Sequence, residues 1–195
     1  MSSKAVDRER GRARAQRIHI VEQAPPRDSG DRDFYIVCPW LGGLAGDSGP
    51  WLSALAIHDC NAFVDEEWTL NAAPILRARC YVGVFALDRL RSTDGLLSSL
   101  DRRGVKQIIN FPSVSFFDSA MAKTLGSLRL DVAAECEFLA KAQGAGFRIA
   151  LCEREGELGA PAAAGLRLDF RVTHRGPPHP FALASAPNSI RSSHR

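Results

Sequence analysis

The feature that most constrains the fold is a regular alternation of short apolar runs with longer helix-like stretches. Continuous apolar runs, typical of strands covered on both faces, occur at 34–38, 80–85, 105–110, 147–152 and 166–172. The run at 17–21 is expected to be a divergent sixth strand. Strands that alternate with helices at this spacing indicate βαβ units and therefore a parallel sheet.

Helices are predicted between these runs from apolar periodicity and from end signals. Ser92, Thr93 or Asp94 is expected to cap the segment GLLSSLDRR. The segment LRLDVAAECEFLAKAQ has the strongest helical pattern, with Gly144 as its stop and these residues on one face: Leu128, Val132, Cys136 and Leu139. Asn61 is predicted to cap a further helix that begins in NAFVDEEW.

The chain is predicted to contain one main domain with an extension at each end. With 195 residues, 45% of them hydrophobic, it can form one substantial core or at most two small ones. Residues 1–32 read as a basic N-terminal arm that includes the divergent strand, and residues 33–176 as the domain. Residues 177–195 are rich in Pro, Ser and charge without periodicity, so they are expected to be a disordered tail.

Composition excludes several classes of protein. A net charge of +3 is too mild to indicate nucleic-acid binding, and no apolar run approaches the length of a membrane span. The five cysteines lie in no CxxC pair, and no histidine pattern completes a zinc site. Scattered thiols in odd number suit a reducing compartment, so we expect a cytoplasmic protein with neither nucleic acid nor membrane as a partner.

The loops that follow the strands are the place to look for function, because ligands of parallel α/β sheets collect at the carboxyl ends of the strands. Asp59 and Asp88 each follow an apolar segment, at what should be the same end of the sheet. Paired carboxylates of this kind suit Mg²⁺. The alternatives are a helix cap for Asp59 and an ordinary turn residue for Asp88.

A strand that ends in the polar segment NFPSVSFFD is expected to face a ligand. The amide of Asn110 could donate to a substrate oxyanion, while Pro112 fixes the turn so that Ser113 and Ser115 face the mouth of the site. The alternative for Asn110 is a turn in which its side chain bonds its own backbone.

Two further titratable residues are candidates for acid–base chemistry. Glu135 lies in the strongest helical segment, where it is either a base facing the strand ends or a surface charge near Glu137 and Lys141. His174 ends the fifth central strand, a suitable place for a general acid or base near neutral pH. The alternative for His174 is a solvated side chain beside Arg175.

Together these segments resemble the TIM-barrel family of phosphoenolpyruvate hydrolase-like proteins, which is related to phosphonopyruvate hydrolase and to the phosphoenolpyruvate mutase/isocitrate lyase superfamily. The C-terminal barrel of the Tm-1-like proteins is similar as well. INFPSV is the closest match, to the family's Q-N-F-P-T-V-G. IHDCNAFV keeps the Asp and Asn of a G-D-A-N segment, and VGVFALDRL keeps Gly, Val and Asp of A-G-V-N-G-T-D-P. AECEFLA and RVTHRG match the family's V-E-M and A-H-M-G segments.

The resemblance implies a parallel (β/α) barrel of the TIM type, incomplete here with five or six of the eight strands. It also implies catalysis on a 2-oxo acid, similar to phosphonopyruvate or phosphoenolpyruvate, in which a C–C or P–C bond breaks through an enolate held by Mg²⁺. The implied metal ligands are Asp59 and Asp88. The implied substrate-binding residues are Asn61, Asn110 and Ser113, and the implied catalytic residues are Asn110, Glu135 and His174.

The alternative function is that of a catalytically inactive, truncated barrel that serves as a binding or regulatory module. Five or six strands leave two open sheet edges, and an exposed edge readily pairs with another chain. A homo-oligomer whose subunits cover these edges is therefore an expected assembly.

Overall fold

The computed structural model describes residues 17–25, 33–42, 59–66, 68, 70–71, 77–117, 119–155, 165–176 and 182–185. Most of the predicted N-terminal arm, the glycine-rich loop at 43–50, His58 and the alanine-rich segment before the fifth central strand lie outside these residues. So does the greater part of the predicted tail.

Within the described part of the chain, seven strands form one sheet in the order in which they occur in the sequence. They are β1 (Ile18–Val21), β2 (Phe34–Val37), β3 (Cys80–Val84), β4 (Gln107–Asn110), β5 (Arg148–Arg154), β6 (Leu168–His174) and β7 (Ala182–Ser185). The first six strands are parallel, and β7 pairs with β6 in the antiparallel direction. The predicted parallel fold with five or six strands, the divergent first strand included, is confirmed.

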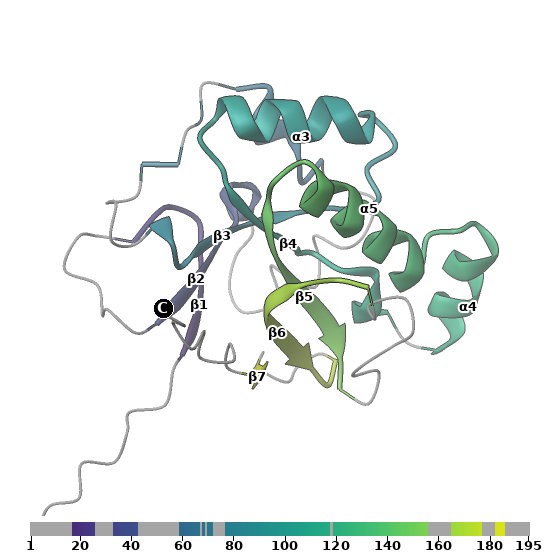
Figure 1. Cartoon of the computed structure of the whole chain (residues 1–195). Coiled ribbons are helices and arrows are strands. Elements are labelled where there is room, and N and C mark those ends of the chain that lie inside the picture. The colour runs from purple at the N-terminus through teal and green to yellow at the C-terminus, as the bar shows by residue number, and fades with distance from the viewer. Residues whose placement is uncertain are drawn as a thin grey trace, which may run out of the picture.

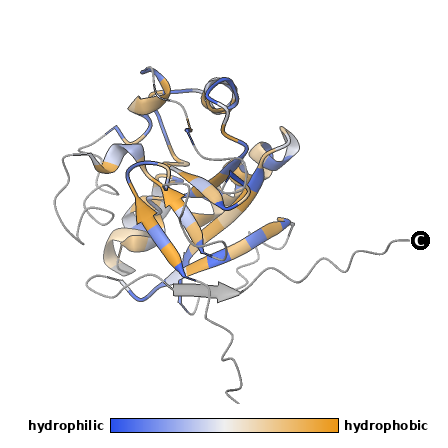
Figure 2. Cartoon of the chain, turned by 90° about the vertical axis from the view of Figure 1, so that its left-hand side faces the viewer, coloured by the Kyte–Doolittle hydropathy of each residue, from blue (hydrophilic) through white to orange (hydrophobic). Residues whose placement is uncertain are grey.

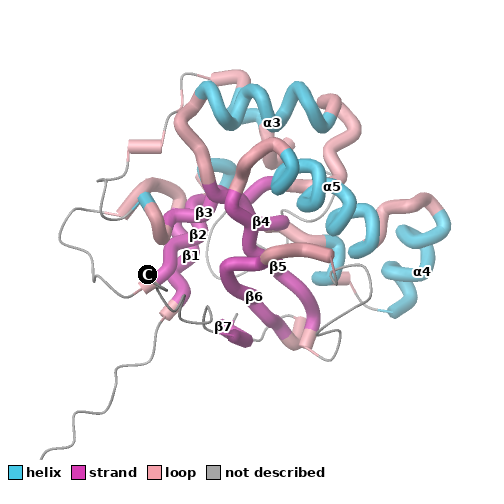
Figure 3. Tube along the Cα trace, viewed as in Figure 1, coloured by secondary structure: helices cyan, strands magenta, loops and turns pink. Residues whose placement is uncertain are grey.

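The sheet is curled into part of a barrel (Figures 1 and 3). Residues on strands that are not neighbours meet across its interior: the rings of Phe34 on β2 and Phe170 on β6 lie 4.5 Å apart. Tyr81 on β3 contacts the same ring of Phe170, at 4.7 Å. These aromatic contacts fill the concave side with apolar side chains, so the architecture is an incomplete α/β barrel.

Three α-helices are described: α3 (Thr93–Arg102), α4 (Ser119–Ser127) and α5 (Val132–Gly144). The hydroxyl of Ser92 caps α3 by accepting from the amide of Gly95, as the sequence predicts. Asp131 caps α5 in the same way, and α5 packs against β4 and β5. Helix α4 lies beyond α5, at the end of the molecule away from β1 and β2 (Figure 1). Three short 3-10 helices complete the list: η1 (Pro39–Leu41), η2 (Ala62–Val64) and η3 (Val114–Phe116).

The structure corrects three details of the sequence prediction. Among the described residues 59–66, 68 and 70–71, the helix expected after Asn61 is just the short η2, because the side chain of Asn61 bonds to the loop after β3 instead of capping. Leu128 precedes α5 and is 58% exposed, so it does not share the buried face of Cys136 and Leu139. Strand β7 lies within the segment predicted to be disordered, where the four residues ALAS pair with the edge of β6.

The core is formed mainly by the strands themselves. All residues of β2, β3 and β4 are buried, and Figure 2 shows the apolar residues along most of the sheet. The five cysteines all lie among the described residues, where they are buried and form no disulfide, as predicted for small apolar side chains. Burial raises the pKa of Cys80 and Cys136 to about 11, which keeps these thiols protonated and unreactive. Among the described helices, none is long and apolar enough to cross a membrane.

Candidate active site at the carboxyl ends of the strands

Asn110, the last residue of β4, joins this strand to β5 through its side chain. Its Oδ1 accepts from the amide of Cys152 at 2.7 Å, and its Nδ2 donates to the carbonyl of the same residue at 3.0 Å. The backbone pairing of β4 with β5 ends one step earlier, at Ile109 and Ala150. The side-chain amide of Asn110 therefore extends the pairing of β4 with β5 by one pair of hydrogen bonds. Its partner is the backbone of the neighbouring strand, and not its own backbone as in the alternative of a local turn.

The segment after Asn110 turns sharply and places two hydroxyls beside it. The Phe111–Pro112 peptide bond is cis, and Ser113 follows as the cap of η3, with its Oγ accepting from the amide of Ser115 at 3.1 Å. Both serines are buried. Their hydroxyls lie 2.8 Å apart, so that one donates to the other.

Glu135 projects from the first turn of α5 into the same place and is completely buried. Its Oε2 accepts from Nδ2 of Asn110 at 2.7 Å and from Oγ of Ser113 at 2.8 Å, and its Oε1 accepts from the amide of Val114 at 2.8 Å. Burial raises the pKa of Glu135 to about 7, although these hydrogen bonds favour the charged form. The carboxyl group can therefore hold or release a proton near neutral pH.

His174, at the end of β6, completes this group. Its Nε2 lies 3.0 Å from Oγ of Ser115, and the edge of its ring contacts Phe116 at 4.9 Å between centroids. Burial and the charge of Arg154 lower the pKa of His174 to about 4, so the imidazole is neutral at pH 7. We call Asn110, Ser113, Ser115, Glu135 and His174 the polar cluster.

Arg154, the last residue of β5, lies directly opposite His174 in the sheet. Its Nε and Nη2 donate to the carbonyl of Ser115 at 3.2 and 3.0 Å, and Nη2 also donates to the carbonyl of Phe117. A Cβ atom added at Gly176 would lie 3.7 Å from Nη1. The side chain thus holds η3 in place and brings a positive charge to the polar cluster.

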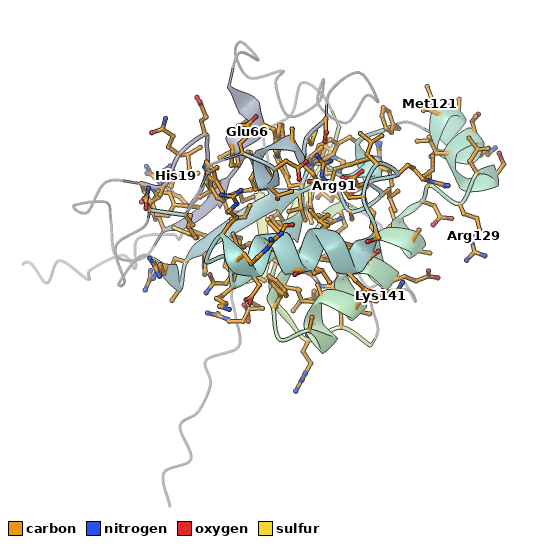
Figure 4. All side chains as sticks on the ribbon, turned by 90° about the horizontal axis from the view of Figure 1, so that it is seen from above. His19, Glu66, Arg91, Met121, Arg129 and Lys141 are labelled. Carbon is orange, nitrogen blue, oxygen red and sulfur yellow. The ribbon has the colours of Figure 1, made fainter. Side chains whose placement is uncertain are left out.

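A second group of charged side chains, which we call the carboxylate cluster, consists of Asp59, Asp65, Asp88, Arg91 and Asn61. Arg91 is its centre: Nη1 and Nη2 donate to the two carboxylate oxygens of Asp59 at 2.9 and 3.0 Å. Nη1 also donates to Oδ2 of Asp88 at 3.0 Å, and Nε donates to Asp65 at 3.1 Å. In Figure 4, Arg91 lies among densely packed side chains, whereas Arg129 and Lys141 extend away from the ribbon.

Asn61 connects this cluster to the strand. Its Nδ2 donates to Oδ2 of Asp88 at 2.9 Å and to the carbonyl of Phe85 at 3.0 Å, while its Oδ1 accepts from the amide of Phe85 at 3.1 Å. Two hydrogen bonds to one backbone unit fix the loop that leaves β3. Both polar atoms of the Asn61 side chain therefore form hydrogen bonds within the protein.

The residues present do not fit the Mg²⁺ site that the sequence suggests. Asp59 and Asp88 do come together, as predicted, but both carboxylates already bind one guanidinium group. Each of their four oxygens accepts at least one hydrogen bond from Arg91, Asn61 or the amide of Leu90. Among the described residues, no group of three or more His, Cys, Asp or Glu side chains is arranged to hold a metal ion.

The predicted site residues therefore fall into two groups. Asn110, Ser113, Glu135 and His174 converge in the polar cluster, and Asp59, Asp88 and Asn61 meet in the carboxylate cluster. The two groups follow neighbouring strands, since Val84 of β3 is paired with Asn110 of β4. Arg91 and Arg154 were not predicted from the sequence to take part in the site. Arg91 lies three residues after the selected Asp88, in the loop after β3, and Arg154 is the last residue of β5.

An incomplete parallel barrel with polar clusters at its strand ends defines a class of α/β barrel proteins whose ligand sites lie on the loops after the strands. A sequence model of the phosphoenolpyruvate hydrolase-like family matches residues 44–168, and the chain belongs to this family. The matched region ends at the first residue of β6, so it includes Glu135 but not His174.

The chain is also similar to the uncharacterized protein y4oT of Sinorhizobium fredii, with 34% identity over 112 residues. This alignment covers 57% of the present chain and 56% of the relative. The chain thus spans about half the length of the curated relative that it matches.

Proposed function

We propose that the chain catalyses a lyase- or hydrolase-type reaction on a 2-oxo acid of the phosphonopyruvate or phosphoenolpyruvate kind. With phosphonopyruvate, the P–C bond next to the keto group breaks, water takes the phosphoryl group to give phosphate, and the electron pair remains on the substrate as the enolate of pyruvate, which a proton converts into pyruvate. With an oxaloacetate-like acid, the C–C bond breaks, the carboxyl group leaves as carbon dioxide, and the same enolate takes up the proton. The observation that carries the proposal is the hydrogen-bonded link between a buried carboxyl group and a buried imidazole at the strand ends. Membership of the family supports the choice of substrate.

The polar cluster supplies what proton transfer to an enolate requires. At neutral pH Glu135 is partly protonated and His174 is neutral, so one group can release a proton that the other can accept. Ser113 and Ser115 connect them through distances of 2.8, 2.8 and 3.0 Å. In this proposal His174 exchanges the proton with the substrate and Glu135 restores it through the two hydroxyls.

Asn110 has a positioning role in this scheme. Its Nδ2 donates to Glu135 and to the carbonyl of Cys152, and these bonds orient the carboxyl group instead of reaching toward a substrate. Arg154 brings a guanidinium group next to His174, which suits a substrate that carries a carboxylate or phosphonate. No step is assigned to Mg²⁺, because Arg91 binds both of its predicted ligands.

The test is release of pyruvate from phosphonopyruvate and from oxaloacetate-like acids, measured for the wild type, Glu135→Gln and His174→Gln. Each variant is expected to lose activity by about 10²- to 10⁴-fold, the usual contribution of general acid–base catalysis. Arg129→Ala is the control, since this side chain is 83% exposed, and it should keep full activity. A folded, monodisperse wild type without turnover at high enzyme concentration would rule out the proposal.

The second candidate function is a catalytically inactive barrel that binds a ligand or a partner. It is favoured by one observation: the side chains of the polar cluster are buried and bonded to one another, and the carboxylate cluster is bonded to Arg91. Calorimetric titration with pyruvate and phosphonopyruvate separates the two functions. Binding that weakens in Arg154→Ala, without turnover in the assay above, would support the binding module.

A further inference from the structure

We infer that Arg91 is a built-in replacement for a divalent cation, so that Asp59 and Asp88 bind no metal in the native chain and would bind one only if Arg91 were removed. This inference concerns the carboxylate cluster and does not depend on the proposed function. It reverses the expectation that the same two aspartates hold Mg²⁺.

The first argument is geometric. The guanidinium group of Arg91 binds Asp59 through two parallel hydrogen bonds of 2.9 and 3.0 Å, the bidentate arrangement in which arginine interacts most strongly with a carboxylate. The same Nη1 donates to Oδ2 of Asp88 at 3.0 Å, and Nε donates to Oδ2 of Asp65 at 3.1 Å. Three carboxylates from two chain segments therefore converge on one cation, and that cation is a side chain of the protein.

The second argument concerns the lone pairs that a metal would need. Oδ1 of Asp88 accepts from the amides of Leu90 and Arg91 at 2.7 and 3.3 Å, and Oδ2 accepts from Asn61 as well as from the guanidinium group. Mg²⁺ requires oxygens at about 2.0–2.1 Å in nearly octahedral geometry. A second cation that bound between Asp59 and Asp88 would have to displace Arg91, since it would otherwise lie next to a positive charge.

The third argument is electrostatic. The carboxylate cluster holds three acids and one base, and two of these charged members are poorly exposed: the side chains of Asp88 and Arg91 are 7% and 16% exposed. The carboxylates also raise the pKa of Arg91 further above its usual value, because they stabilise its charged form. Without this guanidinium group, three negative charges would face one another, with Asp88 largely shielded from water and Asp59 and Asp65 35% and 63% exposed. A hard divalent cation with a few water ligands would then relieve the repulsion.

The experiment uses the full chain and Mn²⁺, which can be followed directly by electron paramagnetic resonance, together with thermal unfolding in Mg²⁺ or EDTA. The wild type is expected to bind no Mn²⁺ tightly and to show the same Tm in both solutions. Arg91→Met removes the charge with little change in length, and it should bind about one Mn²⁺ and gain about 5 °C in Tm when Mg²⁺ is present at 100 times its Kd. Adding Asp88→Asn should abolish this gain.

The control is Arg129→Met, which removes an exposed arginine paired with Glu137 at 3.8 Å and should behave like the wild type. Tight Mn²⁺ binding by the wild type that disappears in Asp88→Asn would overturn the inference. So would an Arg91→Met protein that is folded and binds no more Mn²⁺ than the wild type. If Arg91→Met does not fold, the Mn²⁺ titration of the wild type tests the inference by itself. In addition, Arg91→Lys, which keeps the positive charge, should bind no metal. None of these measurements involves turnover, so their outcome is separate from that of the proposed reaction.

Discussion

Glu135 and His174 lie at the two ends of one hydrogen-bonded chain, although the first belongs to α5 and the second ends β6. Both are buried, and burial favours the neutral form of each, so their pKa values move in opposite directions. Their effects on stability therefore oppose each other between about pH 4 and pH 7. Single substitutions should separate these effects.

Glu135 is expected to make the native state less stable as the pH rises from about 4.5 to 7. In this range the unfolded chain releases the proton of Glu135 while the folded chain keeps it, so the unfolded state binds fewer protons and the free energy of unfolding falls. The change is on the order of 3 kcal/mol for a pKa raised by this amount. Urea unfolding at a series of pH values should show this decline in His174→Gln, where the opposing effect of the histidine is removed, and its absence in the double variant Glu135→Gln/His174→Gln.

His174 is expected to have the opposite effect. Its pKa is lowered from 6.5 to about 4, so the unfolded chain binds the extra proton first as the pH falls through this range, and stability is lost on acidification. A nuclear magnetic resonance titration of the imidazole should show a neutral ring down to about pH 4, with His174→Gln to assign the signal. A midpoint at or above 6.5 in the folded protein would contradict the described burial.

Asn110→Ala should destabilise the protein by about 3 kcal/mol, because it leaves the buried amide and carbonyl of Cys152 without their side-chain partner. Asn110→Asp keeps the size and the acceptor but loses the donors to Glu135 and Cys152, so it should cost at least as much. Lys123→Ala, at an exposed position of α4, is the control and should change the free energy of unfolding by no more than about 0.5 kcal/mol. Equal stability of Asn110→Ala and the wild type would show that the link between β4 and β5 is unimportant.

Gly83 should not tolerate even alanine. A Cβ atom there would lie 2.8 Å from Sγ of Cys38 and 2.8 Å from the carbonyl of Phe111, and both neighbours are buried. We expect Gly83→Ala to cost about 2 kcal/mol or more. Gly126→Ala, in α4, meets no atom within 4 Å and should instead stabilise the protein by about 1 kcal/mol. Chemical denaturation of the two variants measures both effects on one scale.

Much of the fold follows from local patterns. Each central strand was visible as a short apolar run, because strands of a parallel sheet are covered on both faces. The cap of α3 could be narrowed to Ser92, Thr93 or Asp94, of which the structure has Ser92. β7 could not be found in this way, since its four residues form too short an apolar run and become a strand by pairing with the edge of β6. The helix expected after Asn61 failed for a related reason: its side chain has a better partner in the backbone of Phe85.

Most residues of the candidate site could be selected from the sequence, but the hydrogen bonds that join them could not be predicted. Asn110, Ser113 and His174 could be selected because polar residues at strand ends face one edge of a parallel sheet. Glu135, which lies in a helix, was selected because it matches the family's V-E-M segment. The sequence could not show whether Glu135 faced solvent or the interior, since this depends on how α5 is rotated against β4 and β5. Arg91 illustrates the same limit: two aspartates indicate a cation, but the three-dimensional fold decides which cation reaches them.

The direction of β7 has a consequence for any assembly that would complete the barrel. A closed α/β barrel grows by adding parallel strands, and the hydrogen-bonding edge of β6 where the next one would pair is already taken by an antiparallel strand. A protein segment that continued the parallel series at this edge would have to compete with residues 182–185 and displace them. Strand exchange, and not simple docking, is thus the step by which this half-barrel could be closed from that side.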